Sequence, residues 1–163
     1  MIVEQTEQFR TRDGLTLHVR RFEGDAPRRG TLLWIHGGCE HGGRYGHVVE
    51  QFVRDGWSIV LPDHRGHGRS EGERTDVRRV DDYLADLVDL QREFCPDGQA
   101  TVVFRHSFGG LLAIRLAQTT VQPQAMVLSA PLLGLQLPVP WWKHVLGQVL
   151  IHVAPRTRFR TGI

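Results

Sequence analysis

Short apolar runs alternate with helix-length amphipathic segments along most of this chain, and glycine-rich turns join them. Runs rich in Val, Ile and Leu indicate buried strands, whereas apolar residues at three- and four-residue steps indicate helices. The predicted strands are residues 31–35, 57–61, 100–104 and 125–129. The predicted helices are residues 45–54, 80–94 and 109–118. This alternation predicts an α/β fold with a mostly parallel central sheet and flanking helices.

A different pattern precedes the first of these strands. Residues 4–11 and 15–22 flank Asp13-Gly14, a pair that favours a tight turn, so an antiparallel hairpin is predicted at the N-terminal end. In the helix predicted over 80–94, aspartates fill the face opposite the apolar residues, and we expect that face to be solvated. These aspartates are Asp81, Asp82, Asp86 and Asp89.

Charge is divided unevenly along the chain. All 18 Asp and Glu residues lie at or before Asp97, so the chain from Gly98 onward carries only basic side chains among its charged residues. These bases are scattered and do not form the clustered stripe that a phosphate backbone requires. We therefore expect no binding to nucleic acid.

The composition changes after Pro131, where Leu, Val, Pro and Trp dominate. Prolines interrupt this stretch, and its longest continuous part, residues 141–154, is too short to cross about 30 Å of hydrocarbon. We interpret it as a lipophilic cover over a pocket or as an interfacial helix. The change predicts two parts, a core over residues 1–131 and a cover segment over residues 132–163.

Two isolated cysteines, Cys39 and Cys95, lack CxxC spacing and fit free thiols in a reducing compartment. Cys39 and the neighbouring histidines are metal-ligand residue types, but their spacing matches no common zinc pattern. We therefore predict neither a metal site nor a cofactor. The first residues show neither a secretory signal nor a transit peptide, which predicts a cytoplasmic protein.

The strongest local signal for chemistry lies between Val102 and Leu111. It places Ser107 on a turn between a predicted strand and a predicted helix, where a nucleophile elbow projects its hydroxyl above the sheet. The helix N-terminus stabilises negative charge that develops there. Gly109 supplies the small residue that a close strand–helix approach requires, but Arg105 occupies the equivalent position before the serine.

Two glycine-rich loops each follow a predicted strand, one after residues 31–35 and one after residues 57–61. The loop over residues 36–45 can aim a backbone N–H at an oxyanion, although an ordinary turn is the alternative. The loop over residues 63–72 contains neither Gly-Lys-Ser/Thr nor GxGxxG, so a nucleotide site is not favoured there.

Together, these segments resemble motifs of the α/β-hydrolase superfamily, in particular its monoacylglycerol lipase and lysophospholipase-like group, also called the serine aminopeptidase type. HGGCEHGGRY is similar to HGxxEHxxRY, DHRGHGRSEG to DHRGHGxSxG, and RHSFGG to GHSxGG. The resemblance extends from about residue 8 to the final residue. It implies a partial α/β-hydrolase fold with the beginning of a mobile apolar cap, and a carboxylic ester hydrolase activity that needs no cofactor.

The same resemblance implies roles for individual residues. Ser107 would be the nucleophile, and the N–H groups of Gly38 and Phe108 would form the oxyanion hole. The residues that would organise the two loops are His36, Gly37, Glu40, His41, Arg44, Asp63 and Arg65. The candidate acyl-chain contacts, for which simple packing is the alternative, are Leu132, Leu133, Leu135, Trp141 and Trp142.

The chain departs from the family pattern in two places. The family order is serine, then acid, then histidine, yet no Asp or Glu follows Asp97, and the two later histidines, His144 and His152, lie in the cap-like segment. Arg105 stands where the family pattern has glycine, and we expect a steric conflict between strand and helix there.

These observations leave two hypotheses. In the first, the chain is the N-terminal part of a serine hydrolase of small lipophilic esters, with acid and base supplied by a segment not present here. In the second, it is a non-catalytic remnant or association module whose exposed sheet edge binds a complementary C-terminal fragment or a second copy. Peripheral contact of the cap segment with lipid is compatible with both.

Overall fold

The structure is a computed structural model of the chain, and it describes residues 1–74, 76, 79–95, 100–118, 123–134 and 138–154. The chain divides into two compact units, residues 1–133 and 134–163. The first unit holds the sheet and its helices, and the second holds α4 (Trp141–Val153).

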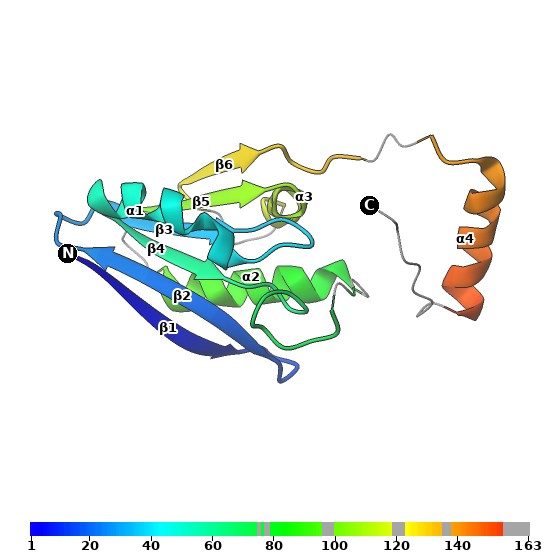
Figure 1. Cartoon of the computed structure of the whole chain (residues 1–163), viewed down its shortest axis with the longest axis horizontal. Coiled ribbons are helices and arrows are strands. Elements are labelled where there is room, and N and C mark those ends of the chain that lie inside the picture. The colour runs from blue at the N-terminus through cyan, green and yellow to red at the C-terminus, as the bar shows by residue number, and fades with distance from the viewer. Residues whose placement is uncertain (75, 77–78, 96–99, 119–122, 135–137, 155–163) are drawn as a thin grey trace. The chain divides into compact units, whose positions relative to one another are not determined.

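The sheet is built from strands in the order β1-β2-β4-β3-β5-β6 (Figure 1). β1 pairs antiparallel with β2, and β2 pairs antiparallel with β4, whereas β4, β3, β5 and β6 run parallel. The predicted N-terminal hairpin and the mostly parallel α/β sheet are therefore confirmed. The strand bounds are β1 (Ile2–Arg10), β2 (Thr16–Gly24), β3 (Gly30–Ile35), β4 (Trp57–Pro62), β5 (Thr101–His106) and β6 (Ala125–Ser129).

Helices of the first unit contribute to two hydrophobic clusters. Alternate residues of β3 belong to different clusters, because successive side chains of a strand point to opposite faces. Leu33 and Ile35 join the cluster with α2 (Val80–Phe94) and α3 (Phe108–Leu116), whereas Leu32 and Trp34 join the cluster with α1 (Gly46–Arg54). A short 3₁₀ helix, η1 (Gly42–Tyr45), leads into α1. The predicted helices all form, α2 with the predicted bounds and α1 and α3 with boundaries shifted by one or two residues.

One expectation about α2 is wrong. Asp86 is not solvated: it is 5% exposed and accepts two hydrogen bonds from Arg65, from Nε at 2.7 Å and from Nη2 at 2.8 Å. Asp81, on the same helix, is exposed as expected. Helical periodicity assigns a residue to a face, but it does not show that a cation from a distant loop lies against that face.

The last strand of the sheet differs from its central strands. Every residue of β3 is buried, whereas Val127 and Leu128 of β6 are 46% and 39% exposed. In the second unit, no residue of α4 is buried. Among the described residues, no helix is both long and apolar enough to cross a membrane.

Removing the Asp86 carboxylate tests the bridge between α2 and the second loop. We expect Asp86→Ala to lower the free energy of unfolding by about 3 kcal/mol, because it leaves the buried Arg65 guanidinium without one of its partners. Asp81→Ala, on the exposed face of the same helix, should change it by less than about 0.5 kcal/mol. Urea denaturation followed by circular dichroism measures both, and equal effects of the two variants would contradict the assignment.

Candidate active site

Ser107 is the single residue between β5 and α3, and its backbone dihedral angles form a sharp turn. Its φ is +50° and its ψ is −114°. A positive φ is uncommon for residues other than glycine because the β-carbon crowds the backbone. Such a conformation costs about 1 to 3 kcal/mol and persists only where surrounding contacts hold it. A strained turn between a strand and a helix is the geometry of a nucleophile elbow.

Backbone hydrogen bonds hold this turn from both sides. The Ser107 N–H donates to Ser129 O at 3.0 Å. Ser107 O accepts from the N–H groups of Gly110 at 2.9 Å and Leu132 at 3.0 Å. The elbow therefore joins β5, β6, α3 and the segment that follows β6.

Gly109 allows α3 to pass the end of β3. A β-carbon at Gly109 would lie 2.7 Å from His36 O and 2.8 Å from Ile35 O, so no larger residue fits without displacing the backbone. Gly109 is thus the small residue that the strand–turn–helix pattern predicts two positions after the serine.

The first glycine-rich loop lies against the elbow. A β-carbon at Gly37 would lie 3.1 Å from Ser107 Cβ, and one at Gly38 would lie 3.6 Å from Phe108 Cβ. Phe108 is the first residue of α3, where backbone N–H groups have no partner within the helix. The structure therefore brings Gly37, Gly38, Ser107 and Phe108 together, as the motifs predict.

Glu40 organises this loop. Its Oε1 accepts hydrogen bonds from the Gly37 N–H and, at 2.7 Å, from the Tyr45 hydroxyl. Burial opposes ionisation of the carboxyl group, but these hydrogen bonds outweigh it and the Glu40 pKa lies below its ordinary value. Arg44 Nη1 lies 3.8 Å from the other carboxylate oxygen of Glu40, Oε2. Tyr45 was not among the residues predicted to organise the loop, although it is the last residue of the motif that contains Glu40.

His41 has a local role at the start of η1. Its side chain caps the 3₁₀ helix, with Nδ1 accepting from the Gly43 N–H at 3.2 Å. This contact fixes the far end of the loop that begins at His36.

His36 joins the first loop to the second. Its Nδ1 lies 2.7 Å from Gly37 O, and its Nε2 accepts from the His64 N–H at 2.9 Å. A carbonyl only accepts, so Nδ1 carries the proton and the ring is neutral. His64 Nε2 donates in turn to His36 O at 3.1 Å. Burial lowers the pKa of His36 to about 4 and holds the pKa of His64 well below its ordinary value.

Asp63 connects the same two loops through its carboxylate. Oδ1 accepts from the Gly42 N–H at 2.7 Å, and Oδ2 accepts from the Arg69 N–H at 2.9 Å. Its own N–H donates to His18 O at 2.8 Å, which ties the second loop to β2. The buried carboxylate is therefore fully used in bracing.

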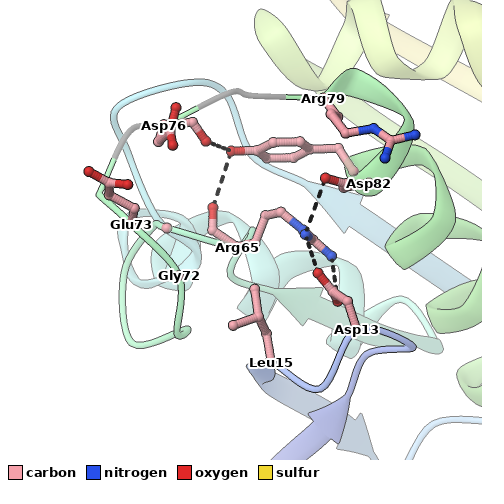
Figure 2. Close-up of a pocket in the computed structure, with 10 residues that line it drawn as sticks. Asp13, Leu15, Arg65, Gly72, Glu73, Asp76, Arg79 and Asp82 are labelled. Carbon is pink, nitrogen blue, oxygen red and sulfur yellow. Dashed lines mark hydrogen bonds and ion pairs between the residues drawn. The ribbon is translucent and has the colours of Figure 1, made fainter. Parts of the chain in front are cut away.

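Arg65 braces the second loop against the hairpin and α2. Besides its bonds to Asp86, it donates to Asp13 at 2.9 and 3.1 Å and lies 3.8 Å from Asp82. These bonds lower the pKa of Asp13 to about 2. Figure 2 shows Arg65 directed at Asp13 and Asp82. These residues line a pocket whose volume is about 310 Å³. Ser107 does not line this pocket, so the Arg65 cluster is structural bracing apart from the elbow.

Arg105 is accommodated in an unusual way. It is fully buried in β5, between Ile35 of β3 and Leu128 of β6, and the strand continues through it to His106. The expected steric conflict therefore does not interrupt the strand. The cost is electrostatic, because all three guanidinium nitrogens lack a hydrogen-bond partner in the described part of the chain. Burial lowers the Arg105 pKa to about 9.

The candidate acyl-chain contacts are divided between the two units. Leu132 adjoins the elbow through its N–H, whereas Leu133 is 75% exposed. Trp141 and Trp142 begin α4 in the second unit and are exposed. Leu135 lies outside the described residues. Within the first unit, Leu132 is the candidate that the structure brings to Ser107.

The contacts of the histidines near and after Ser107 lie within their own units. His106 directs Nδ1 at Ser129 Oγ, 3.2 Å away. In the second unit, His152 Nδ1 lies 2.8 Å from Gln148 O, and His144 belongs to the same exposed helix. The chain contains no carboxylate side chain after Asp97 to orient a catalytic imidazole. Among the described residues, no group of three or more His, Cys, Asp and Glu side chains is placed to bind a metal ion.

Residues 26–163 match the protein family described as "Serine aminopeptidase, S33". The chain belongs to this family of α/β-hydrolases. The match includes the two glycine-rich loops and the turn at Ser107. Solved α/β-hydrolases share the fold. The structure of the α/β-hydrolase GrgF from Penicillium aligns at a TM-score of 0.77 and 23% identity, over 92% of this chain and 53% of that one.

Curated and solved proteins that this chain resembles are longer than the chain. The monoacylglycerol lipase of Mycolicibacterium smegmatis is 36% identical over 110 residues, which cover 66% of this chain and 39% of the lipase. The phospholipase YtpA of Bacillus subtilis is 29% identical over 137 residues, 81% of this chain and 52% of the phospholipase. The structure of a Paleococcus ferrophilus monoacylglycerol lipase aligns at a TM-score of 0.66 and 28% identity, over 94% of this chain and 52% of that one. The chain thus spans about half the length of these relatives or less.

The neutral histidines predict how stability depends on pH. Unfolded histidine binds a proton below its ordinary pKa of about 6.5, whereas folded His36 and His64 resist protonation, so stability is lost as the pH falls below 6.5. Well below pH 6.5 each ring contributes about 1.4 kcal/mol per pH unit, and because an unfolded histidine is half protonated at pH 6.5, the two rings together contribute about 3 kcal/mol between pH 6.5 and 5. Urea denaturation at several pH values measures the slope. His47→Asn, at an exposed site, should leave it unchanged, and a flat profile would contradict the neutral pair.

The buried Arg105 predicts a gain in stability on substitution. Arg105→Met should raise the free energy of unfolding by about 2 to 4 kcal/mol at pH 7, because it removes an unpaired buried charge and keeps most of the volume. Above pH 9 the difference in free energy of unfolding between Arg105→Met and wild type should narrow. The reason is that Arg105 then releases its proton in the folded wild-type chain but retains it in the unfolded chain. Arg115→Met, at an exposed site of α3, serves as the matched control. A destabilised Arg105→Met protein would show that the guanidinium has a partner.

Proposed function

We propose that this chain contributes the nucleophile half of a serine hydrolase of lipophilic carboxylic esters, such as monoacylglycerols or lysophospholipids. The observation that carries the proposal is the strained turn at Ser107, placed against the Gly37-Gly38 loop. Relatives described as a monoacylglycerol lipase and a phospholipase support the substrate class.

In the proposed reaction, Ser107 Oγ attacks the ester carbonyl and its hydroxyl proton passes to a base. The carbon–oxygen bond to the alcohol breaks, the alcohol leaves with a proton, and the acyl group stays on Oγ. Water then attacks this acyl-enzyme, releases the fatty acid and restores the serine hydroxyl. The N–H groups of Gly38 and Phe108 donate to the carbonyl oxygen when it becomes an oxyanion.

Bracing residues keep the two donors in place before substrate binds. Glu40 holds the Gly37 N–H, and His36 and Asp63 hold the first loop against the second. Preorganised donors cost no reorganisation during the reaction, which is why a hydrolase benefits from a rigid loop here. The apolar side chains of Leu132, Trp141 and Trp142 suit an acyl chain or a lipid surface.

In this proposal, two catalytic groups come from outside the 163 residues. One is the base that takes the Ser107 proton, and the other is the acid that orients this base. The carboxylate-free stretch after Asp97 supports that division. The isolated chain is therefore expected to be inactive or incomplete as a catalyst.

A second candidate function is a non-catalytic association module. The observation that favours it is β6, an uncharged and partly exposed strand at the end of the sheet. The two candidates differ in whether Ser107 has any chemical reactivity.

Covalent labelling separates the two candidates. We expect a long-chain fluorophosphonate to form one adduct slowly on Ser107 of the purified chain, located by peptide mass spectrometry, without turnover of a monoacylglycerol. Ser107→Ala should abolish the adduct, and Ser129→Ala, at the neighbouring serine, should retain it. An adduct that survives Ser107→Ala would overturn the nucleophile assignment. Turnover that depends on Ser107 would overturn the need for an external acid and base, and so would turnover restored by Arg105→Gly alone.

The rate of labelling tests the oxyanion donor. Gly38→Pro removes the backbone N–H and should slow adduct formation about 100-fold, the effect of losing one such donor. Gly38→Ala keeps the N–H and places its β-carbon at ordinary contact distance, so labelling should stay within about 3-fold of the wild-type rate. Equal rates for the two variants would contradict the role of Gly38.

A further inference from the structure

Arg105 lies on the face of the sheet that the start of α3 covers. It pairs with Ile35 of β3, and paired residues of neighbouring strands share a face. A β-carbon at Gly109 would lie 3.1 Å from Ile35 Cγ2, so the first turn of α3 passes over this face. Ser107 follows two residues after Arg105, a separation of about 7 Å at the rise of an extended strand. The Arg105 side chain therefore lies on the side of the sheet where α3 begins, close to the nucleophile elbow.

This side chain is a buried cation whose charge is not compensated by a described neighbour. Arg105 has no exposed surface, and its guanidinium nitrogens have no hydrogen-bond partner among the described residues. A further group could reach it only by displacing the side chains that cover it. The charge contributes to the lowered pKa of His64, whose ring centroid lies 6.2 Å from that of Phe108. The Arg105 charge therefore acts on a ring that packs against the residue after Ser107.

Two physical effects disfavour positive charge at this place. The N-terminal end of a helix carries partial positive charge from its free backbone N–H groups. A guanidinium without a counterion is also costly in an interior of low dielectric constant. Both costs fall when negative charge forms at Ser107, because an anion there attracts the helix end and the guanidinium together. An interaction that becomes favourable only as charge develops lowers the barrier to the reaction.

We propose that Arg105 stabilises, through space, the negative charge that develops at Ser107 and in the oxyanion hole when the serine attacks an ester. Arg105 acts without a hydrogen bond to Ser107. It raises the electrostatic potential at the elbow, so the serine hydroxyl ionises more readily. The inference rests on the proposed function and adds a group that the family pattern, with glycine at this position, does not contain. It also gives a reason for a costly residue beside the nucleophile, since strain at such sites is part of their mechanism.

The rate of fluorophosphonate labelling reports the potential at the elbow. In this reaction the Ser107 hydroxyl gives its proton to solvent, Oγ forms a bond to phosphorus, and the phosphorus–fluorine bond breaks with release of fluoride. Negative charge develops on Oγ and on the phosphoryl oxygen during the attack. A buried unit charge about 10 Å away, at an effective dielectric constant of about 20, changes such a rate about 10-fold.

Removal of the charge should therefore slow labelling of the full 163-residue chain. We expect Arg105→Met, which keeps most of the volume, to label about 10-fold more slowly than wild type at pH 7. Its expected gain in stability cannot account for a slower reaction. Arg115→Met removes the same charge at an exposed site of α3 and should label within about 2-fold of the wild-type rate.

The pH dependence separates charge from packing. The ratio of wild-type to Arg105→Met rates should fall toward one above pH 9, where folded Arg105 releases its proton. The neutral rings of His36 and His64 do not change charge between pH 7 and 10, and neither does Tyr83, whose pKa is raised to about 12. β6 and the first turn of α3 contribute no titratable side chain.

The conservative variant Arg105→Lys keeps the charge on a weaker base. Its labelling advantage over Arg105→Met should disappear at a lower pH than that of wild type, because a buried lysine releases its proton before a buried arginine does. If Arg105→Met does not fold by circular dichroism, the comparison of Arg105→Lys with wild type decides, and identical pH profiles would overturn the proposal.

The remaining outcomes distinguish this inference from the proposed function. Equal labelling rates for wild type and Arg105→Met, with the adduct on Ser107 in both, would overturn the electrostatic role and leave the nucleophile assignment standing. A rate ratio that stays constant from pH 7 to 10 would do the same, because the slower rate would then come from altered packing. Absence of the adduct from wild type and every variant would overturn both.

Discussion

The close passage of α3 across the end of β3 is the constraint on which the rest of the site depends. Gly109 lets the helix backbone reach the carbonyls of Ile35 and His36, and this approach leaves one residue, Ser107, to reverse the chain. Ser107 is the single residue between β5 and α3, and it adopts a positive φ. The bracing by His36, Glu40 and Asp63 then has a clear purpose: it keeps the Gly37-Gly38 backbone beside a turn that is already fixed.

Much of this arrangement was predictable from the sequence because it follows local patterns. The hairpin at Asp13-Gly14, the buried strand over residues 31–35 and the turn at Ser107 each depend on residues within about ten positions of one another. Glycine spacing carries similar information. Gly109 is required where the backbone of α3 approaches the end of β3, and the strand–turn–helix pattern that contains it predicted that approach.

What the sequence did not predict depends on contacts between distant segments. The α2 periodicity assigned Asp86 to a solvated face, but Arg65 reaches it from the second loop and buries it. The environment of Arg105 was not predicted either. Its position two residues before Ser107 predicted a steric conflict between strand and helix, and not a buried guanidinium without a hydrogen-bond partner among the described residues. Both cases involve a charged side chain whose energy is set by its neighbours in space, and neither periodicity nor motif spacing reports those neighbours.

Among its described residues, the first unit therefore combines a well-braced turn with a buried cation that has no hydrogen-bond partner and an apolar strand at the end of the sheet. We therefore expect the 163-residue chain to form the β5–Ser107–α3 turn by itself. Amide hydrogen exchange, resolved by residue, tests this most directly at the Ser107, Gly110 and Leu132 amides, whose hydrogen bonds define the turn. The account predicts exchange slowed to the same degree as in β3. Exchange at the rate of an unfolded chain at these three amides, with β1 to β4 still protected, would contradict it.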